Sequence, residues 1–193
     1  MKQQRQLILA SASPRRAELL TQIGVKFNKH PVDLDESALP AERPYELVMR
    51  LAGAKAKAAA KMLAGNSDVM LASDTIVVLD DQALGKPVDF AHAKHMLSSL
   101  SGRSHQVLTA ISLLDAYRQK TVCVSTEVQF ATLSDDDIED YWATGEPADK
   151  AGAYGIQGIA GQFVRSIQGS YSAVVGLPLY ETVQLLKEFE VIK

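Results

Sequence analysis

The chain has 193 residues and a formal net charge of −3, because 20 lysine and arginine residues face 23 aspartate and glutamate residues. Hydrophobic residues make up 47% and charged residues 22%, proportions typical of a globular protein and not of a disordered or fibrous one. A chain with this charge has no overall basic field to hold a nucleic-acid backbone. Any polyanionic ligand must therefore be met by a local group of cations.

The cysteine count and the apolar runs limit the compartment. Cys123 is the only cysteine, which excludes an intramolecular disulfide and a cysteine-rich zinc site. The apolar stretch at residues 7–10 is too short for the core of a signal peptide, and no run approaches the roughly 20 residues that span a bilayer. We expect a cytoplasmic protein that binds neither membrane nor nucleic acid.

Strands and helices alternate in the first half of the predicted structure. Residues 7–10 predict a short buried strand, after which Ser13 caps a helix that begins at Pro14 and ends at Gly24. A longer amphipathic helix is predicted from Pro44 to a stop at Gly65. Two apolar runs, residues 69–72 and 75–79, predict buried strand that is interrupted by Ser73 and Asp74.

The chain continues with a predicted turn at Asp81 and Gln82 and a brief strand at residues 83–84. A third helix is marked by Phe90, Ala93, Leu97 and Leu100 and is predicted to end near Gly102. The later elements are two strands over residues 106–114 and 121–132, a helix opened by a capping box of Ser134 and Asp137, a glycine-rich loop over residues 152–161, and a last helix opened by Pro178. This order predicts the α/β class with a mixed sheet. Without a repeat, linker or clear boundary, residues 1–193 are predicted to form one domain.

The segment Ser11–Arg16 is the strongest signal for a ligand. It places the hydroxyls of Ser11 and Ser13 and the guanidinium groups of Arg15 and Arg16 around a predicted helix N-terminus. Free backbone N–H groups and the helix dipole favour an anion there, and arginine adds bidentate donors that match phosphate. The alternative is a well-capped surface helix with two solvated arginines.

The other charged residues indicate a functional site only when they are considered as a group. Asp74 lies between two apolar runs, which suits a metal ligand or general base, although an aspartate at a strand end is an equal alternative. The acidic cluster Asp33, Asp35 and Glu36 offers oxygen ligands for Mg²⁺ or Mn²⁺, or is a solvated loop. Lys55 and Lys86 are candidates to neutralise phosphate charge.

Read in order, these segments resemble the Maf family of nucleotide pyrophosphatases over nearly the whole chain. The resemblance rests on these motifs: Leu9–Arg16, Asp33–Glu36, Arg50–Ala52, Lys55–Ala56, Ser73–Thr75, Gly85–Pro87, Leu100–Gly102 and Asp149–Gly158. It implies an elongated mixed sheet flanked by helices, similar to inosine triphosphate pyrophosphatases, with a nucleotide in a cleft between two lobes. A homodimer is a further expectation from the same resemblance.

The resemblance also implies roles for individual residues. Asp74 would accept the proton of the attacking water, and Glu36 would help Asp74 hold a divalent metal, Mg or Mn. Lys55 and Lys86 would serve catalysis, and the substrate would be bound by Ser11, Ser13, Arg15, Arg16, Thr75 and Gln157.

Arg15, Thr75 and Gln157 match the family branch that resembles dTTP/UTP pyrophosphatases, which has a house-cleaning role in nucleotide pools. Ala54 stands where the family often carries an acidic residue, and Ser73 stands where Gly or Ala is commoner. The alternative function is a nucleotide- or RNA-binding regulatory protein without turnover, since residues 155–158 match the Gly-x-x-Gly loop of KH domains.

Overall fold

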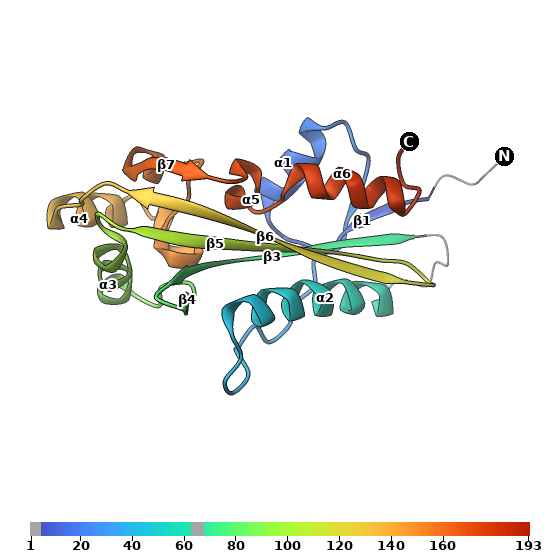
Figure 1. Ribbon diagram of the computed structural model, residues 1–193, viewed down its shortest axis with the longest axis horizontal. Helices are drawn as coiled ribbons and strands as arrows, with labels where there is room; N and C mark the ends of the chain where they lie inside the picture. Colours follow the sequence, from blue (N-terminus) through green and yellow to red (C-terminus); the bar gives the residue numbers. More distant parts are fainter. Residues whose placement is uncertain (1–4, 63–67) are drawn as a thin grey trace.

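The computed structural model describes residues 5–62 and 68–193. A seven-stranded mixed sheet runs the length of the molecule in the order β2-β1-β3-β5-β6-β7, with β4 paired to β3 (Figure 1). The strands are β1 (Leu7–Leu9), β2 (Asn28–Lys29), β3 (Val69–Leu79), β4 (Gln82–Leu84), β5 (Ser104–Leu114), β6 (Gln119–Phe130) and β7 (Val164–Gln168). The α/β class and the mixed sheet predicted from the sequence are confirmed.

Six α-helices are found in the described residues, and they lie on both faces of this sheet. They are α1 (Pro14–Gln22), α2 (Pro44–Met62), α3 (Phe90–Leu100), α4 (Asp135–Ala143), α5 (Tyr171–Val175) and α6 (Leu179–Glu188). Helix α2 covers one face, where it packs on β3, β5 and β6, while α1, α5 and α6 lie on the opposite face (Figure 1). Three short 3₁₀ helices follow α4: η1 (Glu146–Asp149), η2 (Ala151–Ala153) and η3 (Ile159–Phe163).

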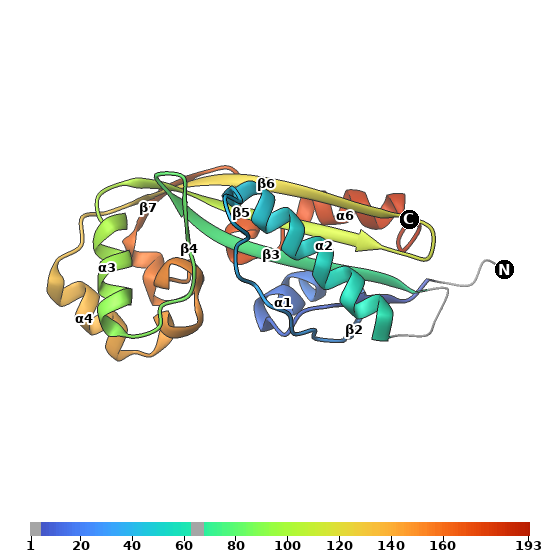
Figure 2. The same cartoon turned by 90° about the horizontal axis from the view of Figure 1, so that it is seen from below.

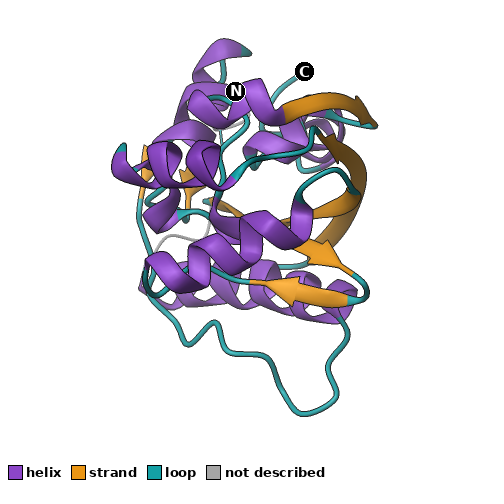
Figure 3. Cartoon of the chain, turned by 90° about the vertical axis from the view of Figure 1, so that its left-hand side faces the viewer, coloured by secondary structure: helices purple, strands orange, loops and turns teal. Residues whose placement is uncertain are grey.

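Two lobes are joined by the long strands β3, β5 and β6 (Figure 2). One lobe holds α3, α4 and the 3₁₀ helices around a core that includes Leu97, Phe130 and Tyr141. The other holds α1 and α6, whose core includes Leu20 and Phe189, and α2 on the far face of the sheet. The end view shows helices packed against the curved sheet (Figure 3).

Several predicted helix boundaries agree with the structure. The capping box is present, because the Ser134 hydroxyl accepts from the Asp137 N–H at 3.1 Å while the Asp137 carboxylate accepts from the Ser134 N–H at 2.8 Å. The first helix ends beside Gly24, whose φ of +71° is easily adopted only without a side chain. The predicted end of the second helix at Gly65 lies outside the described residues.

The predicted interruption of the strand at Ser73 and Asp74 is wrong. Strand β3 is 11 residues long and includes both Ser73 and Asp74. Its pairing with β5 is unbroken, from Met70 opposite Leu114 to Val78 opposite Gln106. Polar side chains do not end a strand whose backbone hydrogen bonds are complete on one side.

The edge of β3 that does not pair with β5 is open in the middle of the strand. Strand β1 covers only residues 69–71 of β3, and β4 covers only residues 77–79. Residues 72–76 therefore have no neighbouring strand on this edge, and Ser73 and Asp74 lie in the opening.

The glycine-rich stretch at residues 152–161 was predicted to be loop, and this is only partly right. Helices η2 and η3 occupy half of it, with Gly152 at a φ of +67° inside η2. Strand β7 and helix α5 carry too little periodic signal in five residues each to be found from the sequence. No helix within residues 5–62 or 68–193 combines the length and the apolar character needed to cross a membrane.

Candidate active site

A cavity of about 660 Å³ lies at the open edge of β3, between the two lobes. Its walls come from the β1–α1 turn, the middle of β3, α2 and the segment that follows α4. The residues to which the family resemblance gave a role all line it: Ser11, Ser13, Arg15, Arg16, Glu36, Lys55, Asp74, Thr75, Lys86 and Gln157. Segments that are far apart in the chain thus converge on one space.

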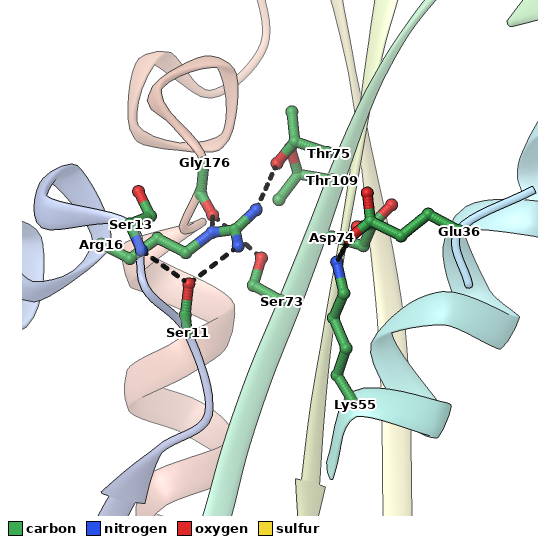
Figure 4. A network of polar contacts seen from close by, with 10 residues as sticks. All are labelled: Ser11, Ser13, Arg16, Glu36, Lys55, Ser73, Asp74, Thr75, Thr109 and Gly176. Atoms are coloured by element: carbon green, nitrogen blue, oxygen red, sulfur yellow. Dashed lines mark hydrogen bonds and ion pairs between the residues drawn. The ribbon is translucent and has the colours of Figure 1, made fainter. Parts of the chain in front are cut away.

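Asp74 and Thr75 point to opposite faces of the sheet, as neighbouring residues in a strand must. Asp74 faces Lys55 and α2, whereas Thr75 and Ser73 face Arg16 and the turn after α5 (Figure 4). Because no strand covers this part of β3, one cavity reaches side chains on both faces.

The face toward α2 carries an ammonium group between two carboxylates. Lys55 Nζ lies 2.6 Å from Asp74 Oδ1 and 2.6 Å from Glu36 Oε1. Lys55 is 9% exposed and Asp74 is 6% exposed, so their charges are far less screened than those of a surface pair. Partial burial alone would raise the pKa of Glu36, but the hydrogen bond and charge of Lys55 outweigh it and lower that pKa.

The contacts of this region account for the two positions, Ala54 and Ser73, at which the sequence departs from the family pattern. Ala54 supplies no charge, and Lys55 instead takes its carboxylate partners from Asp74 and Glu36. The Ser73 hydroxyl donates to the Gly176 carbonyl at 2.9 Å, so it ties β3 to the turn after α5.

The opposite face is organised by Arg16, which is half-buried. Its Nε donates to the Gly176 carbonyl at 2.9 Å, its Nη1 to the Ser11 hydroxyl at 3.1 Å and its Nη2 to the Thr75 hydroxyl at 3.3 Å. Three of its five N–H groups are therefore used inside the protein, and two remain for a ligand. Burial lowers the pKa of Arg16, while the charge of Asp74 opposes that shift.

The predicted cap of the first helix is wrong in one detail. The hydroxyl of Ser13 makes no capping hydrogen bond, although Ser13 is the residue before the helix. The Ser11 hydroxyl accepts from the Ser13 N–H instead, at 3.2 Å. The first turn of α1 is thus left without a side-chain cap at the wall of the cavity, an arrangement that favours an anion.

Arg15 and Lys86 also line the cavity, and neither side chain has a hydrogen bond or ion pair with another described residue. The acidic cluster contributes less than its composition indicated. Glu36 alone lines the cavity, whereas Asp35 accepts from the Ser37 N–H at 2.9 Å and Asp33 is exposed outside it.

Glu146 is a functional candidate that the sequence did not reveal. Its carboxylate lines the cavity and accepts from the Tyr141 hydroxyl at 2.8 Å and from the Ile159 N–H at 2.9 Å. Burial alone would raise the pKa of Glu146, but these donors outweigh it and lower that pKa. The only sequence signal was a glutamate ahead of Pro147 and the glycine-rich segment.

The glycines of this segment serve packing within the protein. A Cβ at Gly158 would lie 2.2 Å from Glu146 Oε2, and one at Gly152 would lie 2.9 Å from the Val77 side chain. At Gly161 it would meet the Ile156 carbonyl at 2.9 Å. Neighbouring protein atoms, and not the close approach of a ligand, therefore require glycine at these positions.

The oxygen donors for a metal are few. Within residues 5–62 and 68–193, no three His, Cys, Asp or Glu side chains group closely enough to hold an ion by themselves. Asp74 and Glu36 are the two carboxylates that meet at Lys55. Mg²⁺ in nucleotide sites commonly takes one or two carboxylates and completes its shell with phosphate and water oxygens, and this pair fits that pattern.

Comparison with known proteins agrees with the motif order. The family model described as Maf-like protein matches residues 6–189. The chain belongs to the Maf family. A Maf-family relative from Pseudoalteromonas translucida, named a dTTP/UTP pyrophosphatase, is 57% identical over 182 residues, covering 94% of this chain and 95% of the relative. A second, from Vibrio parahaemolyticus and of the same name, is 51% identical and covers 98% of this chain and 100% of its own length.

The fold of this Maf chain also has a more distant likeness. A HAM1 protein from Coxiella burnetii superposes with a TM-score of 0.55 at 17% identity, over 95% of this chain and 99% of that one. At that identity the likeness concerns the fold alone.

Proposed function

We propose that the chain hydrolyses pyrimidine nucleoside triphosphates, dTTP and UTP, to the nucleoside monophosphate and pyrophosphate. The observation that carries this proposal is the shared cavity, which is lined both by Asp74 with its Lys55 partner and by the cations Arg15, Arg16 and Lys86. The Maf-family relatives named dTTP/UTP pyrophosphatases support the same chemistry.

The triphosphate would lie along the cationic side of the cavity. The first turn of α1 and the two remaining N–H groups of Arg16 offer fixed donors. The side chains of Arg15 and Lys86 can bind phosphate without breaking a hydrogen bond or ion pair to another described residue. Lys86 is exposed, so it can adjust to the outer phosphates. Hydrolysis of the bond between the α- and β-phosphates depends on neutralisation of the phosphate charge more than on covalent chemistry. These groups supply that neutralisation.

Asp74 would accept the proton of the attacking water. Its Oδ1 is held by Lys55 at 2.6 Å, while Oδ2 has no hydrogen bond to a described residue. The water oxygen forms a bond to the α-phosphorus, its proton passes to Asp74, and the bond from the α-phosphorus to the bridging oxygen breaks to release pyrophosphate. A Mg²⁺ or Mn²⁺ ion held by Asp74 and Glu36 would supply further positive charge to the phosphates.

The base end of the substrate would face Thr75 and Gln157. Both line the cavity, next to apolar side chains that include Val77 and Val107. The Gln157 amide both donates and accepts, as the edge of uracil or thymine requires.

The decisive test is pyrophosphate release from a panel of nucleoside triphosphates with Mg²⁺ and with Mn²⁺. We expect turnover on dTTP and UTP, and a fall of roughly 10²-fold or more in Asp74→Asn because the proton acceptor is lost. Asp136→Asn, an exposed change on α4, is the matched control. In ¹⁸O-labelled water the label should enter the monophosphate; label in pyrophosphate, or full activity of Asp74→Asn, would refute the mechanism.

The alternative of a regulatory protein without turnover is not favoured by the relatives. The Gly155–Gly158 segment that resembled a KH loop is held against the Glu146 carboxylate, a negative group that repels a nucleic-acid backbone. Multiple turnover on UTP, with weak and salt-sensitive RNA binding, would separate the two functions.

The cellular setting is also a proposal. A lone half-buried cysteine, with the pKa of Cys123 raised to about 11 by burial, and a metabolite substrate both suit the cytoplasm. A homodimer, acting in nucleotide-pool house-cleaning, follows from the family resemblance. Cell fractionation and the molecular mass in solution test these two statements.

A further inference from the structure

The Thr75 hydroxyl is half-buried and belongs to a chain of hydrogen-bonded oxygens that leads into the buried interior, and the hydrogen positions along this chain can be worked out. Arg16 Nη2 lies 3.3 Å from Thr75 Oγ1, which lies 3.0 Å from Thr109 Oγ1. Thr109 Oγ1 in turn lies 2.7 Å from the Ala173 carbonyl oxygen. Thr75 and Thr109 face each other directly on paired strands, and Thr109 is 0% exposed.

The direction of the chain is fixed at its far end. A carbonyl oxygen can only accept, so the single hydroxyl hydrogen of Thr109 must point to Ala173; otherwise two lone pairs would face each other at 2.7 Å. Helix α5 is too short to supply another donor, since the Leu177 N–H bonds to the Ser172 carbonyl and not to Ala173. The hydrogen of Thr109 is therefore committed.

The same reasoning then applies to Thr75. Because Thr109 has no hydrogen left to donate, the hydrogen between the two hydroxyls belongs to Thr75. Arg16 has no acceptor and must donate to Thr75. All donors thus point in one direction, from Arg16 through Thr75 and Thr109 to Ala173, an order in which each bond polarises the next.

From this order we infer that Thr75 meets the substrate only as a hydrogen-bond acceptor, and that Thr109 is the positioning residue that makes it one. This inference rests on the proposed function, and it concerns how that site reads the base. An acceptor that faces N3 of the base binds the N3–H of uracil or thymine and disfavours cytosine, whose N3 is itself an acceptor. A phosphate oxygen, which has no hydrogen at neutral pH, is excluded as the partner of Thr75.

The surroundings of Thr75 agree with a base and not a phosphate. Val77 lies two residues along β3 on the same face, directly across from Val107, and both line the cavity. Ile156 and Val174 line it as well. This apolar wall suits the flat face of a pyrimidine.

The test is equilibrium binding of UMP, N3-methyl-UMP and CMP, which needs no turnover. In the unaltered protein we expect N3-methyl-UMP to bind roughly tenfold or more weakly than UMP, because its N3 has no hydrogen. In Thr109→Val the hydrogen of Thr75 is released and can turn toward cytosine N3, so the preference for UMP over CMP should fall by roughly tenfold. Thr109→Ser keeps the hydroxyl and should restore the preference.

Two results would overturn the inference: equal binding of UMP and N3-methyl-UMP, or an unchanged UMP to CMP ratio in Thr109→Val. If Thr109→Val does not fold, Thr75→Val is the deciding variant. It should reduce the difference in affinity between UMP and N3-methyl-UMP, and an unchanged difference would overturn the inference. A protein that shows the expected binding pattern but releases no pyrophosphate from UTP would refute the proposed function and leave this inference standing.

Discussion

The carboxylate of Glu146 lies directly against the backbone of Gly158, where a Cβ would come within 2.2 Å of Oε2. This contact joins the start of η1 to the segment that carries Gln157. Glu146 also accepts from the Ile159 and Ala160 N–H groups, at 2.9 and 3.4 Å. One half-buried carboxylate thereby fixes the part of the cavity wall that carries Gln157.

Gly158→Ala should therefore displace this segment. The φ of Gly158 is −103°, outside the left-handed region that favours glycine, so the clash with Glu146 is the main penalty. We expect a loss of about 2 kcal/mol in the free energy of unfolding and weaker nucleotide binding, measured by urea unfolding and calorimetry. Gly85→Ala, where nothing lies within 4 Å, is the control, and the loss should shrink in a Glu146→Ala background. Equal losses in both backgrounds would contradict this account.

Lys55→Met should leave Asp74 and Glu36 without the ammonium that both contact. Because Asp74 is buried, we expect stability at neutral pH to fall by about 3 kcal/mol. A divalent cation can take the place of the ammonium, so Mg²⁺ should raise the melting temperature of this variant more than that of the unaltered protein. Lys57→Met, an exposed change on the same helix, should have no such effect. If Mg²⁺ does not change the melting temperature of Lys55→Met, Asp74 and Glu36 are not metal ligands.

Arg16 and Arg15 should respond differently to lysine. Arg16 donates to three separate acceptors, and the single nitrogen of lysine cannot reach all of them. We expect Arg16→Lys to lower the free energy of unfolding by about 2 kcal/mol, and Arg15→Lys to change it by less than about 0.5 kcal/mol. Both variants should bind triphosphate more weakly. Denaturant unfolding and UTP binding measure the two effects, and equal stability losses would show that Arg16 has no special structural role.

His105 should make stability fall in mild acid. It is 3% exposed, its Nε2 lies 2.7 Å from the Tyr154 hydroxyl, and its Nδ1 has no hydrogen-bond partner among the described residues. Burial lowers its pKa to about 4, against about 6.5 in an unfolded chain. The folded state therefore binds the proton less readily, and the contribution of neutral His105 is complete above about pH 6.5 and is lost as pH falls toward 4.

The measurement is the free energy of unfolding of the unaltered protein and of His105→Gln between pH 7 and pH 4. Glutamine does not titrate and can still reach Tyr154. The stability advantage of the unaltered protein should shrink by up to about 3 kcal/mol over this range. A difference that stays constant with pH would show that His105 is not held neutral by burial.

The sequence by itself determined the elements and the chemical character of the site. Periodic apolar positions predicted most strands and helices, and the order of the Ser11–Arg16, Ser73–Thr75 and Asp149–Gly158 motifs identified the family. Local signals suffice for this because capping residues and side-chain periodicity act over a few residues. Short elements such as α5 and β7 escaped detection because five residues hold too little periodicity.

Only the tertiary structure decided how these residues act together. Asp74 and Thr75 are neighbours in sequence, yet they face opposite sides of β3, and one cavity reaches both because β1 and β4 leave residues 72–76 uncovered. The contacts of Lys55 with Glu36, of Glu146 with Gly158 and of Thr75 with Thr109 join segments that no local pattern relates. Strand pairing between distant segments sets these positions, and it is fixed by packing of the whole chain and not by any single stretch of it.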